Sequence, residues 1–345
     1  MFGIQENTND GNLINKYKKM KILGMGNALV DILIRLENDN VLATYDLPKG
    51  SMQLVDRVKS ERILAGTEDL EKTIASGGSA ANTIHGLAAL GVGTGFLGTI
   101  GKDFWGELFE QDIRNNNIEP KLIYSNTESG RAIALVSKDS ERTFATFLGA
   151  AVELSADNID EKIFRGYNYF HIEGYLVQNK DLIRKAVTLA KQLGLKVSLD
   201  LASYNVVEDN LEMIRELVKS NVDILFANEE EAKAFTGKNP GEAIFDIAKD
   251  VEIAIIKLGK NGSIIKKGNE YAEVGVIKAD SIDTTGAGDL YASGFLYGLI
   301  NGKTLKRSGE IGALLSGRVI EIIGPKPDKY MWGEIRELIN SGQII

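Results

Sequence analysis

Short apolar runs alternate with amphipathic stretches along most of the chain after residue 20. The expected strands cover residues 21–26, 94–100, 167–174, 195–202, 222–227 and 251–259. The expected helices cover residues 80–90, 103–116, 180–193, 209–220 and 229–236. Alternation of strands and helices predicts an α/β fold with a mostly parallel sheet covered by helices on both faces. The apolar strands lack period-2 alternation, as expected when both faces of a sheet are buried.

Two regions interrupt this pattern. Residues 28–55 and 121–147 contain short strand-like segments separated by polar turns, which we interpret as antiparallel strands. They predict a small sheet that covers one edge of the main domain as a lid over a cleft. The alternative is that they extend the main sheet. Beyond Gly286 the pattern is helical to the end of the chain.

Residues 1–19 differ from the rest of the chain. They are rich in Asn and Lys and have little periodic apolar content, so we expect a mobile N-terminal tail. Residues 20–345 contain no internal repeat and no low-complexity linker. They are therefore expected to form one domain that includes the lid.

Composition narrows the function. The 345 residues include 40 basic and 48 acidic side chains, a formal net charge of −8, which argues against a nucleic-acid partner. The chain contains no cysteine, so disulfides, thiolate catalysis and cysteine–zinc sites are excluded. We find no apolar run of transmembrane length and expect no membrane partner. A cytoplasmic enzyme is the expected class.

The segment DTTGAGD (283–289) precedes an apolar helical stretch. The small residues Gly286, Ala287 and Gly288 allow a ligand to approach the backbone, and a helix N-terminus attracts anions, so this segment predicts a phosphate site. Asp289 falls in the first helical turn. It either caps the helix or acts as a general base beside the phosphate. Asp283 either orients the loop or contributes to a cation site.

Three other segments carry candidate polar groups. Gly77 and Gly78 precede a small-residue helix containing Asn82, which either binds vicinal hydroxyls or belongs to a tightly packed turn and helix. Asp31 lies in an apolar run after Asn27 and needs a partner, either a polyol or a buried backbone or arginine group. Asn228 and Glu231 share a helix face after a strand. They indicate either a helix cap or water-mediated magnesium coordination.

Two other glycine-containing segments do not support nucleotide-binding motifs. GMGNAL (24–29) begins like a dinucleotide fingerprint, but Leu29 stands where a small residue is needed, which argues against a nicotinamide oxidoreductase. GLINGKT (298–304) is one residue shorter than a P-loop and follows a helix rather than a strand. It is better interpreted as a helix that ends at Gly302.

The four candidate segments occur in the order and spacing of the ribokinase-like (PfkB) carbohydrate kinase family, and the resemblance covers residues 20–330. The 283–289 segment, with Ser293, Gly294 and Phe295, resembles the C-terminal signature of the family along its whole length. The segment from Gly77 to Asn82 resembles the N-terminal signature. Ile84 departs from the small residue usual there, a departure shared by adenosine-kinase-like members. The resemblance implies a three-layer α/β/α fold with a small β-sheet lid.

The resemblance also implies roles for individual residues. Asp289 is similar to the base that deprotonates a substrate CH₂OH group, and Gly286, Ala287 and Gly288 are similar to the anion hole for the γ-phosphate of ATP. Arg142 resembles an arginine near the transferred phosphate. The implied acceptor site consists of Asn27, Asp31, Gly77, Gly78 and Asn82. The implied ATP and metal sites consist of Asn228, Lys257, Gly259 and Gly262, with Glu231 for Mg²⁺ through water and Asp283 for a monovalent cation such as K⁺.

Within the family, GMGNALVD and HIEGYLV are more similar to the adenosine-kinase branch, whose nucleobase pocket Tyr175 and Leu176 resemble. The expected activity is therefore ATP-dependent and Mg²⁺-dependent phosphorylation of a small-molecule acceptor, with an adenosine-like nucleoside favoured. A free-sugar kinase acting on ribose, fructose or a related sugar is the alternative. A non-catalytic ligand sensor on the same fold is a third class. A monomer or a homodimer is expected.

Overall fold

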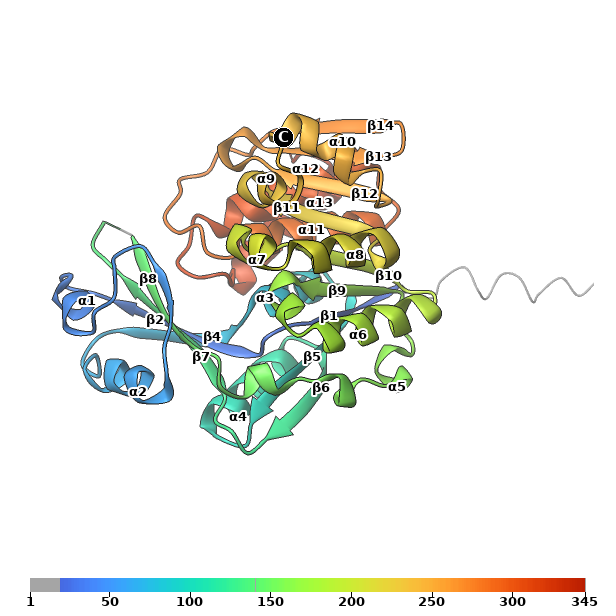
Figure 1. Cartoon of the computed structure of the whole chain (residues 1–345). Coiled ribbons are helices and arrows are strands. Elements are labelled where there is room, and N and C mark those ends of the chain that lie inside the picture. Colours follow the sequence, from blue (N-terminus) through green and yellow to red (C-terminus); the bar gives the residue numbers. More distant parts are fainter. Residues whose placement is uncertain (1–18, 140, 345) are drawn as a thin grey trace, which may run out of the picture.

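A computed structural model describes residues 19–139 and 141–344 of the chain (Figure 1). It contains a large sheet between two layers of helices and a smaller sheet beside them. The predicted mobile tail lies outside the described residues, apart from residue 19. No helix in the described ranges combines the length and apolar character needed to cross a bilayer.

The large sheet has nine strands in the order β14-β13-β12-β11-β10-β9-β1-β5-β6. Neighbours from β12 to β6 are parallel, and β13 and β14 are antiparallel additions at one edge. The prediction of a mostly parallel sheet is therefore confirmed. The strands are β1 (Lys21–Met25), β5 (Gly93–Gly101), β6 (Ile118–Ser125), β9 (Tyr169–Glu173), β10 (Lys196–Asp200), β11 (Ile224–Asn228), β12 (Ile253–Lys257), β13 (Ser263–Lys267) and β14 (Glu270–Val274).

Helices bury both faces of this sheet. In β1, Ile22 packs into the core on one face and Leu23 into the core on the other, which explains the missing period-2 alternation. One face is covered by α5 (Glu161–Phe164), α6 (Lys180–Gln192), α7 (Tyr204–Asp209), α8 (Leu211–Asn221), α9 (Glu229–Thr236) and α10 (Pro240–Ile247). The other is covered by α3 (Ser79–Ala89), α4 (Phe104–Asn115), α11 (Ala287–Ile300) and α12 (Leu305–Val319), with α13 (Lys329–Ser341) packed on α12. The 3₁₀ helices are η3 (Gly149–Glu153), η4 (Ala156–Asn158), η5 (Gly174–Gln178) and η6 (Gly259–Asn261).

The small sheet has the strand order β3-β8-β7-β2-β4 and lies beside the main domain (Figure 1). Its strands are β2 (Leu29–Arg35), β3 (Met52–Leu54), β4 (Lys72–Gly77), β7 (Gly130–Val136) and β8 (Arg142–Phe147), and α1 (Asn40–Thr44) and α2 (Arg57–Ala65) lie in its connections. Val30, Ile32 and Ile34 of β2 pack in one core with Ile63 of α2. Because side chains alternate along a strand, Asp31 faces the opposite side of the sheet.

Three details of the predicted small sheet were wrong. Residues 121–125 belong to β6 of the main sheet, an edge strand whose partly exposed face produces polar–apolar alternation. The predicted segments also omit β4, which supplies the fifth strand. Moreover, the sheet is mixed rather than antiparallel, because β2 pairs parallel with β7 and β3 pairs parallel with β8.

The chain crosses between the main domain and the small sheet at several points. Residues 26–28 link β1 to β2, Gly78 links β4 to α3, and residues 126–129 link β6 to β7. Several predicted site residues lie at these crossings. Side chains from both sheets therefore lie near the carboxyl ends of the parallel strands, where α/β proteins bind ligands.

Candidate active site

Helices α3 and α11 approach each other closely because their contact residues are small. A Cβ atom on Gly86 would lie 2.4 Å from the Ser293 hydroxyl oxygen, so only glycine permits this separation. The Ser293 hydroxyl donates to the backbone carbonyl of Thr83, and the Thr83 hydroxyl donates to the carbonyl of Asp289 at 3.1 Å. The predicted small-residue helix thus packs tightly, and the packing sets α3 against the first turn of α11.

The Asp289 carboxylate is held by two side chains of α3. Ser79 Oγ donates to Oδ1 at 2.7 Å, and Asn82 Nδ2 donates to Oδ2 at 3.0 Å. Burial raises the pKa of Asp289 to about 6, although the hydrogen bonds from Asn82 and Ser79 offset part of the rise. A carboxyl group that titrates near neutral pH is suited to accept a proton from a hydroxyl group. Asp289 accepts both hydrogen bonds from side chains of another helix, and Gly286, the residue before α11, has no side-chain cap.

The first turn of α11 has the geometry of an anion site. Gly286 precedes the helix with φ of 72°, a left-handed conformation that glycine adopts without strain. The first N–H groups of a helix lack intrahelical acceptors and lie at the positive end of its dipole. A Cβ atom on Gly288 would lie 3.2 Å from Lys257 Nζ, so the ammonium group lies directly against this turn.

Lys257 is part of a buried charge cluster at the strand ends. Its Nζ lies 2.8 Å from Asp200 Oδ2, with the two side chains 16% and 6% exposed. Burial opposes the charge of Lys257, but Asp200 and Glu231 outweigh burial and raise its pKa. The lysine therefore stays charged beside the helix N-terminus, where an anion would bind.

Asn228 and Glu231 form a reciprocal cap at the start of α9. Asn228 Oδ1 accepts from the Glu231 N–H at 2.8 Å, while the Asn228 N–H and Nδ2 donate to the Glu231 carboxylate at 2.8 and 2.7 Å. The capping interpretation is therefore realised. Burial nevertheless raises the pKa of Glu231, although Lys257 opposes the rise. Among the described residues, no three His, Cys, Asp or Glu side chains are grouped so that they could hold a metal ion by themselves.

Gly259 and Gly262 flank the η6 turn between β12 and β13. Gly259 is exposed, with open space where a Cβ would point. A Cβ atom on Gly262 would lie 1.9 Å from the carbonyl oxygen of Val274 in β14, so the packing of this turn also requires glycine at position 262. Lys257 is the last residue of the strand before this turn, so the turn follows the charge cluster directly in sequence.

The predicted acceptor residues meet where the small sheet joins the main domain. A Cβ atom on Gly77 would lie 2.1 Å from the carboxyl carbon of Asp31, so glycine is needed for the carboxylate to fit. Gly78 has φ of 97°, and a Cβ there would lie 2.2 Å from the carbonyl oxygen of Asn27. Burial raises the pKa of Asp31 to about 7, although Lys326 lowers it, and Asp289 adds to the rise.

Glu173, at the end of β9, joins Asn27 to α3. One carboxylate oxygen accepts from the Asn27 N–H at 2.8 Å and from Asn27 Nδ2 at 2.7 Å, and the other accepts from the Ala80 N–H at 3.0 Å. Burial raises the pKa of Glu173 to about 7 despite these bonds. These hydrogen bonds fix the position of Asn27 and give a backbone N–H in the first turn of α3 an acceptor that the helix itself does not supply.

Asn82 has an unused acceptor. Its Oδ1 is buried and has no hydrogen-bond partner among the described residues, while its Nδ2 is engaged with Asp289. A buried amide oxygen without a donor is costly. A ligand hydroxyl that donates to it would remove this cost, which fits the prediction that Asn82 binds hydroxyls.

Tyr175 and Leu176 lie in η5, directly after Glu173. Tyr175 is partly buried, and burial raises its pKa to about 12, with Glu173 and Asp289 adding to the rise. Leu176 is only 6% exposed and packs in the core on the α6 and α8 face. Of the two predicted nucleobase contacts, Tyr175 is therefore more exposed than Leu176 and better able to contact a ligand.

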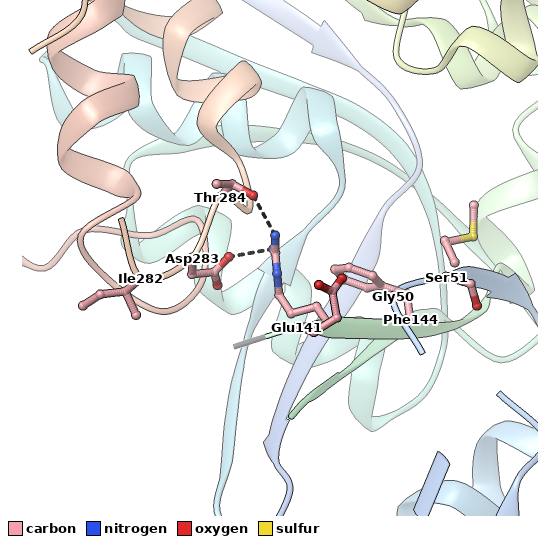
Figure 2. Close-up of a pocket in the computed structure, with 9 residues that line it drawn as sticks. Gly50, Ser51, Glu141, Phe144, Ile282, Asp283 and Thr284 are labelled. Atoms are coloured by element: carbon pink, nitrogen blue, oxygen red, sulfur yellow. Dashed lines mark hydrogen bonds and ion pairs between the residues drawn. The ribbon is translucent and has the colours of Figure 1, made fainter. Parts of the chain in front are cut away.

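Arg142 reaches from β8 of the small sheet to the loop before α11. Its guanidinium lies 2.6 Å from Asp283 Oδ1 and donates to Thr284 Oγ1 at 2.9 Å, and Figure 2 draws both contacts as dashed lines. Asp283 also accepts from Thr285 N and Oγ1, both at 2.7 Å, and from Gly324 N at 2.8 Å. The residues around this contact line a pocket of about 400 Å³. Because Arg142 already balances the charge of Asp283, K⁺ binding there stays a prediction.

Sequence reasoning missed four residues of this site. Glu173 and Asp200 each end a buried parallel strand, and a charged residue at that position is the signal that would have found them. Ser79, which binds Asp289, had no signal beyond its place after Gly78. Lys326 had none, because it approaches from a loop far along the chain.

Comparisons with known proteins find relatives that are similar in sequence and fold. A nucleoside kinase from Methanocaldococcus jannaschii is 30% identical over 275 residues, which are 78% of this chain and 86% of that protein. A solved probable sugar kinase from Rhizobium etli CFN 42 is 34% identical, with a TM-score of 0.85, covering 95% of this chain and 99% of that one. A solved adenosine kinase from Sinorhizobium meliloti is also 34% identical, with a TM-score of 0.83, covering 92% and 99%.

The family assignment rests on more than these relatives. The sequence pattern of pfkB family carbohydrate kinases matches residues 55–328. That range contains Asp289, Asn82 and Lys257 and most of the small sheet. The Rhizobium structure extends the similarity of fold to 95% of the chain. The chain belongs to the pfkB family of carbohydrate kinases, and its enzyme class is that of a phosphotransferase.

Proposed function

We propose that the protein transfers the γ-phosphate of ATP to the CH₂OH group of a nucleoside, with Asp289 as the general base. The observation that carries this proposal is the position of Asp289. Its carboxylate lies in the first turn of α11, the turn against which Lys257 is packed, and its hydrogen bonds tie it to Asn82 of the acceptor side. A base between a phosphate site and a hydroxyl site is the arrangement that phosphoryl transfer needs.

The phosphate side uses the N-terminus of α11 and the charge cluster. The N–H groups of residues 286–288 would bind the transferring phosphate, with Lys257 offsetting its charge. Asn228, Gly259 and Gly262 would line the rest of the ATP site. The acidic Glu231 fits an outer position for Mg²⁺ through water, and Mg²⁺ between the phosphates supplies positive charge for the transfer.

The acceptor side uses Asp31, Asn27 and Asn82 above Gly77 and Gly78. Asp31 and the unpaired Oδ1 of Asn82 are acceptors that match two hydroxyl donors of a ribose. Glycine at positions 77 and 78 lets the Asp31 carboxylate and the Asn27 backbone lie directly against this turn. Two fixed acceptors orient the sugar so that one primary hydroxyl faces Asp289.

A nucleoside is favoured over a free sugar by two observations. Tyr175 follows Glu173 at the edge of the site and offers an aromatic ring for a nucleobase. The relatives include a nucleoside kinase and an adenosine kinase. A probable sugar kinase is as similar to this chain in fold and in sequence identity as the adenosine kinase is, so a free-sugar kinase is the second candidate.

The small sheet would act as a lid. Asp31 and Arg142 both belong to it, and Arg142 contacts the loop before α11. Closure over the acceptor would exclude water, which otherwise competes for the phosphate. The proposal also includes a cytoplasmic location and a monomer or homodimer.

We expect kcat/KM for the acceptor to fall in two steps as the pH decreases. Burial raises the pKa of Asp31 to about 7 and that of Asp289 to about 6. Ionised Asp31 offers both oxygens as acceptors to the substrate hydroxyls, and only ionised Asp289 can take a proton. Activity is therefore present above about pH 7 and lost below it, with a limiting slope of about two on a logarithmic plot. Initial rates measured over this range test the expectation. A flat profile down to about pH 5 would contradict it.

The proposal is tested by ADP release with ATP and Mg²⁺ at equal concentrations of adenosine, ribose and fructose. The Asp289→Asn variant is the blank, because it separates transfer to the acceptor from contaminating ATPases. Preference for adenosine supports the proposal. Preference for ribose or fructose replaces the nucleoside with a sugar and leaves the phosphate side unchanged. Absence of ADP release with all three acceptors contradicts the proposal and favours a ligand sensor on the kinase fold.

A further inference from the structure

The Asp283 carboxylate is surrounded by groups that use its lone pairs. Its Oδ1 accepts from the N–H and from the hydroxyl of Thr285, both at 2.7 Å, and its Oδ2 accepts from the Gly324 N–H at 2.8 Å. The guanidinium of Arg142 makes the fourth contact, with Nη1 2.6 Å from Oδ1. A carboxylate offers about four lone-pair positions, so these four contacts leave no oxygen position open for an additional ion.

Arg142 supplies the positive charge at this carboxylate. No other basic side chain among the described residues forms an ion pair with Asp283, and the two paired side chains are only 17% and 4% exposed. Arg142 Nη2 also donates to Thr284 Oγ1 at 2.9 Å, which holds the guanidinium in place. A buried carboxylate needs a counter-charge, and a guanidinium suits a buried ion pair because it is always charged and weakly hydrated.

The surroundings of Asp283 do not fit the predicted K⁺ site. A dehydrated K⁺ ion requires several oxygen ligands in place of its water shell. Asp283 is instead faced by two backbone N–H groups, a hydroxyl that donates to it, and a guanidinium, and the three nitrogen groups have no lone pair for an ion. The nearby carbonyl of Ile320 accepts from the N–H groups of Ile282 and Asp283, at 2.7 and 3.1 Å, so it is engaged as well.

The ion pair joins the small sheet to the segment that supports the anion site. Arg142 lies in β8, whereas Asp283 lies in the loop that leads to Gly286 and α11. Asp283 accepts from the N–H of Gly324, and a Cβ atom on Gly286 would lie 2.5 Å from Cβ of the next residue, Pro325. Asp283 thus holds the segment that packs against the start of α11, and its counter-charge comes from the other sheet.

We propose that Arg142 acts as an internal cation for Asp283, in the place predicted for K⁺, so that the kinase works without a monovalent ion. The inference goes beyond the proposed function, and it replaces the prediction of a K⁺ site at Asp283. Arg142 is then a positioning residue, because by balancing Asp283 it supports the loop that sets the first turn of α11. Only the activity readout of this inference rests on the proposed function.

The wild-type protein is expected to be indifferent to K⁺. In the experiment, K⁺ is exchanged for tetramethylammonium at constant ionic strength, with Mg²⁺ and ATP supplied as potassium-free salts. We expect kcat with adenosine to stay within about twofold and the midpoint of thermal unfolding to stay constant as K⁺ increases, because a bound ion would stabilise the folded state. A larger activation, or a midpoint that rises with the K⁺ concentration, would overturn the inference.

A set of variants tests whether Arg142 acts through Asp283. Arg142→Met leaves the buried carboxylate without its counter-charge and should lower the midpoint of thermal unfolding. In Arg142→Met/Asp283→Asn the unpaired charge is absent, so the loss should be smaller than the sum of the two single losses. Arg142→Lys, which keeps the positive charge, should retain more stability and more turnover than Arg142→Met.

Arg307 of α12 provides the matched control. It forms a 3.0 Å ion pair with Glu310 outside the proposed site, and its side chain is 22% exposed, close to the exposure of Arg142. The losses from Arg307→Met and Asp283→Asn should be additive in the double variant, as expected for residues without a shared partner.

The outcomes separate this inference from the proposed function. If K⁺ has no effect but the losses from Arg142→Met and Asp283→Asn are additive, Arg142 does not act through Asp283, and the inference is overturned while the proposed function stands. If no acceptor is phosphorylated, the proposed function fails, and the effect of K⁺ on unfolding together with the double variant still decides the inference. If Arg142→Met does not fold, Arg142→Gln, which keeps a donor for Thr284, replaces it in the comparison.

Discussion

Replacing Asp289 with asparagine is expected to lower kcat by about 10²–10⁴-fold, the usual range for removal of a general base. The amide has nearly the shape of the carboxylate and can keep a hydrogen bond to Ser79 or Asn82. It cannot take a proton from the acceptor hydroxyl. The phosphate site is built from backbone N–H groups and Lys257, so ATP binding should persist.

The stability of this variant provides the control. Burial raises the pKa of Asp289 above its ordinary value, so the charged carboxylate costs folding free energy above about pH 4 and most above about pH 6. The asparagine variant should therefore be at least as stable as the wild type at pH 7. Thermal unfolding and ATP titration, measured beside kcat, separate lost chemistry from lost structure. A folded variant that keeps more than about a tenth of the wild-type rate would show that Asp289 is not the base.

Replacing Lys257 with methionine is expected to lower kcat by about 10²–10³-fold, the loss typical of removing a preorganised group that stabilises transition-state charge. The ammonium group lies against Gly288, where charge on the transferring phosphate would develop. The variant should also lose stability, because Asp200 is left buried without its partner, a change that typically costs ~3–5 kcal/mol. Steady-state kinetics and urea unfolding measure the two effects.

A double variant separates these two effects. In Asp200→Asn/Lys257→Met the unpaired carboxylate is gone, so most of the stability should return while kcat stays low. Lys257→Arg, which keeps the positive charge, should retain more turnover than either. Recovery of turnover together with stability in the double variant would show that Lys257 acts only by supporting the fold.

The fold was predictable from the sequence because its strands are buried on both faces. Within the expected strand 222–227, residues 224–227 are apolar at every position, and such segments differ clearly from the amphipathic helices between them. The small sheet was harder to predict because its pairing is mixed. Residues 121–125 were placed in the wrong sheet because an edge strand of the main sheet has the same alternation as a strand with one exposed face.

The candidate site was predictable only where chemistry is local in sequence. Gly286, Gly288 and Asp289 lie in one turn, and Asn228 and Glu231 lie in another, so their spacing alone indicates a shared site. The pairs that complete the site join distant segments. Asp200 lies 57 residues before Lys257, and Ser76 lies 250 residues before Lys326. No local pattern specifies such contacts, because they depend on the strand order and on the path of the chain after α12.

The central claim is most directly tested by a crystal structure with adenosine, Mg²⁺ and a non-hydrolysable ATP analogue. The proposed function predicts that the primary hydroxyl oxygen lies within about 2.6–3.2 Å of the Asp289 carboxylate. It also predicts that the ribose diol contacts Asp31 and that the terminal phosphate lies at the N-terminus of α11. A complex in which the primary hydroxyl faces away from Asp289, or in which the terminal phosphate lies elsewhere, would contradict the account.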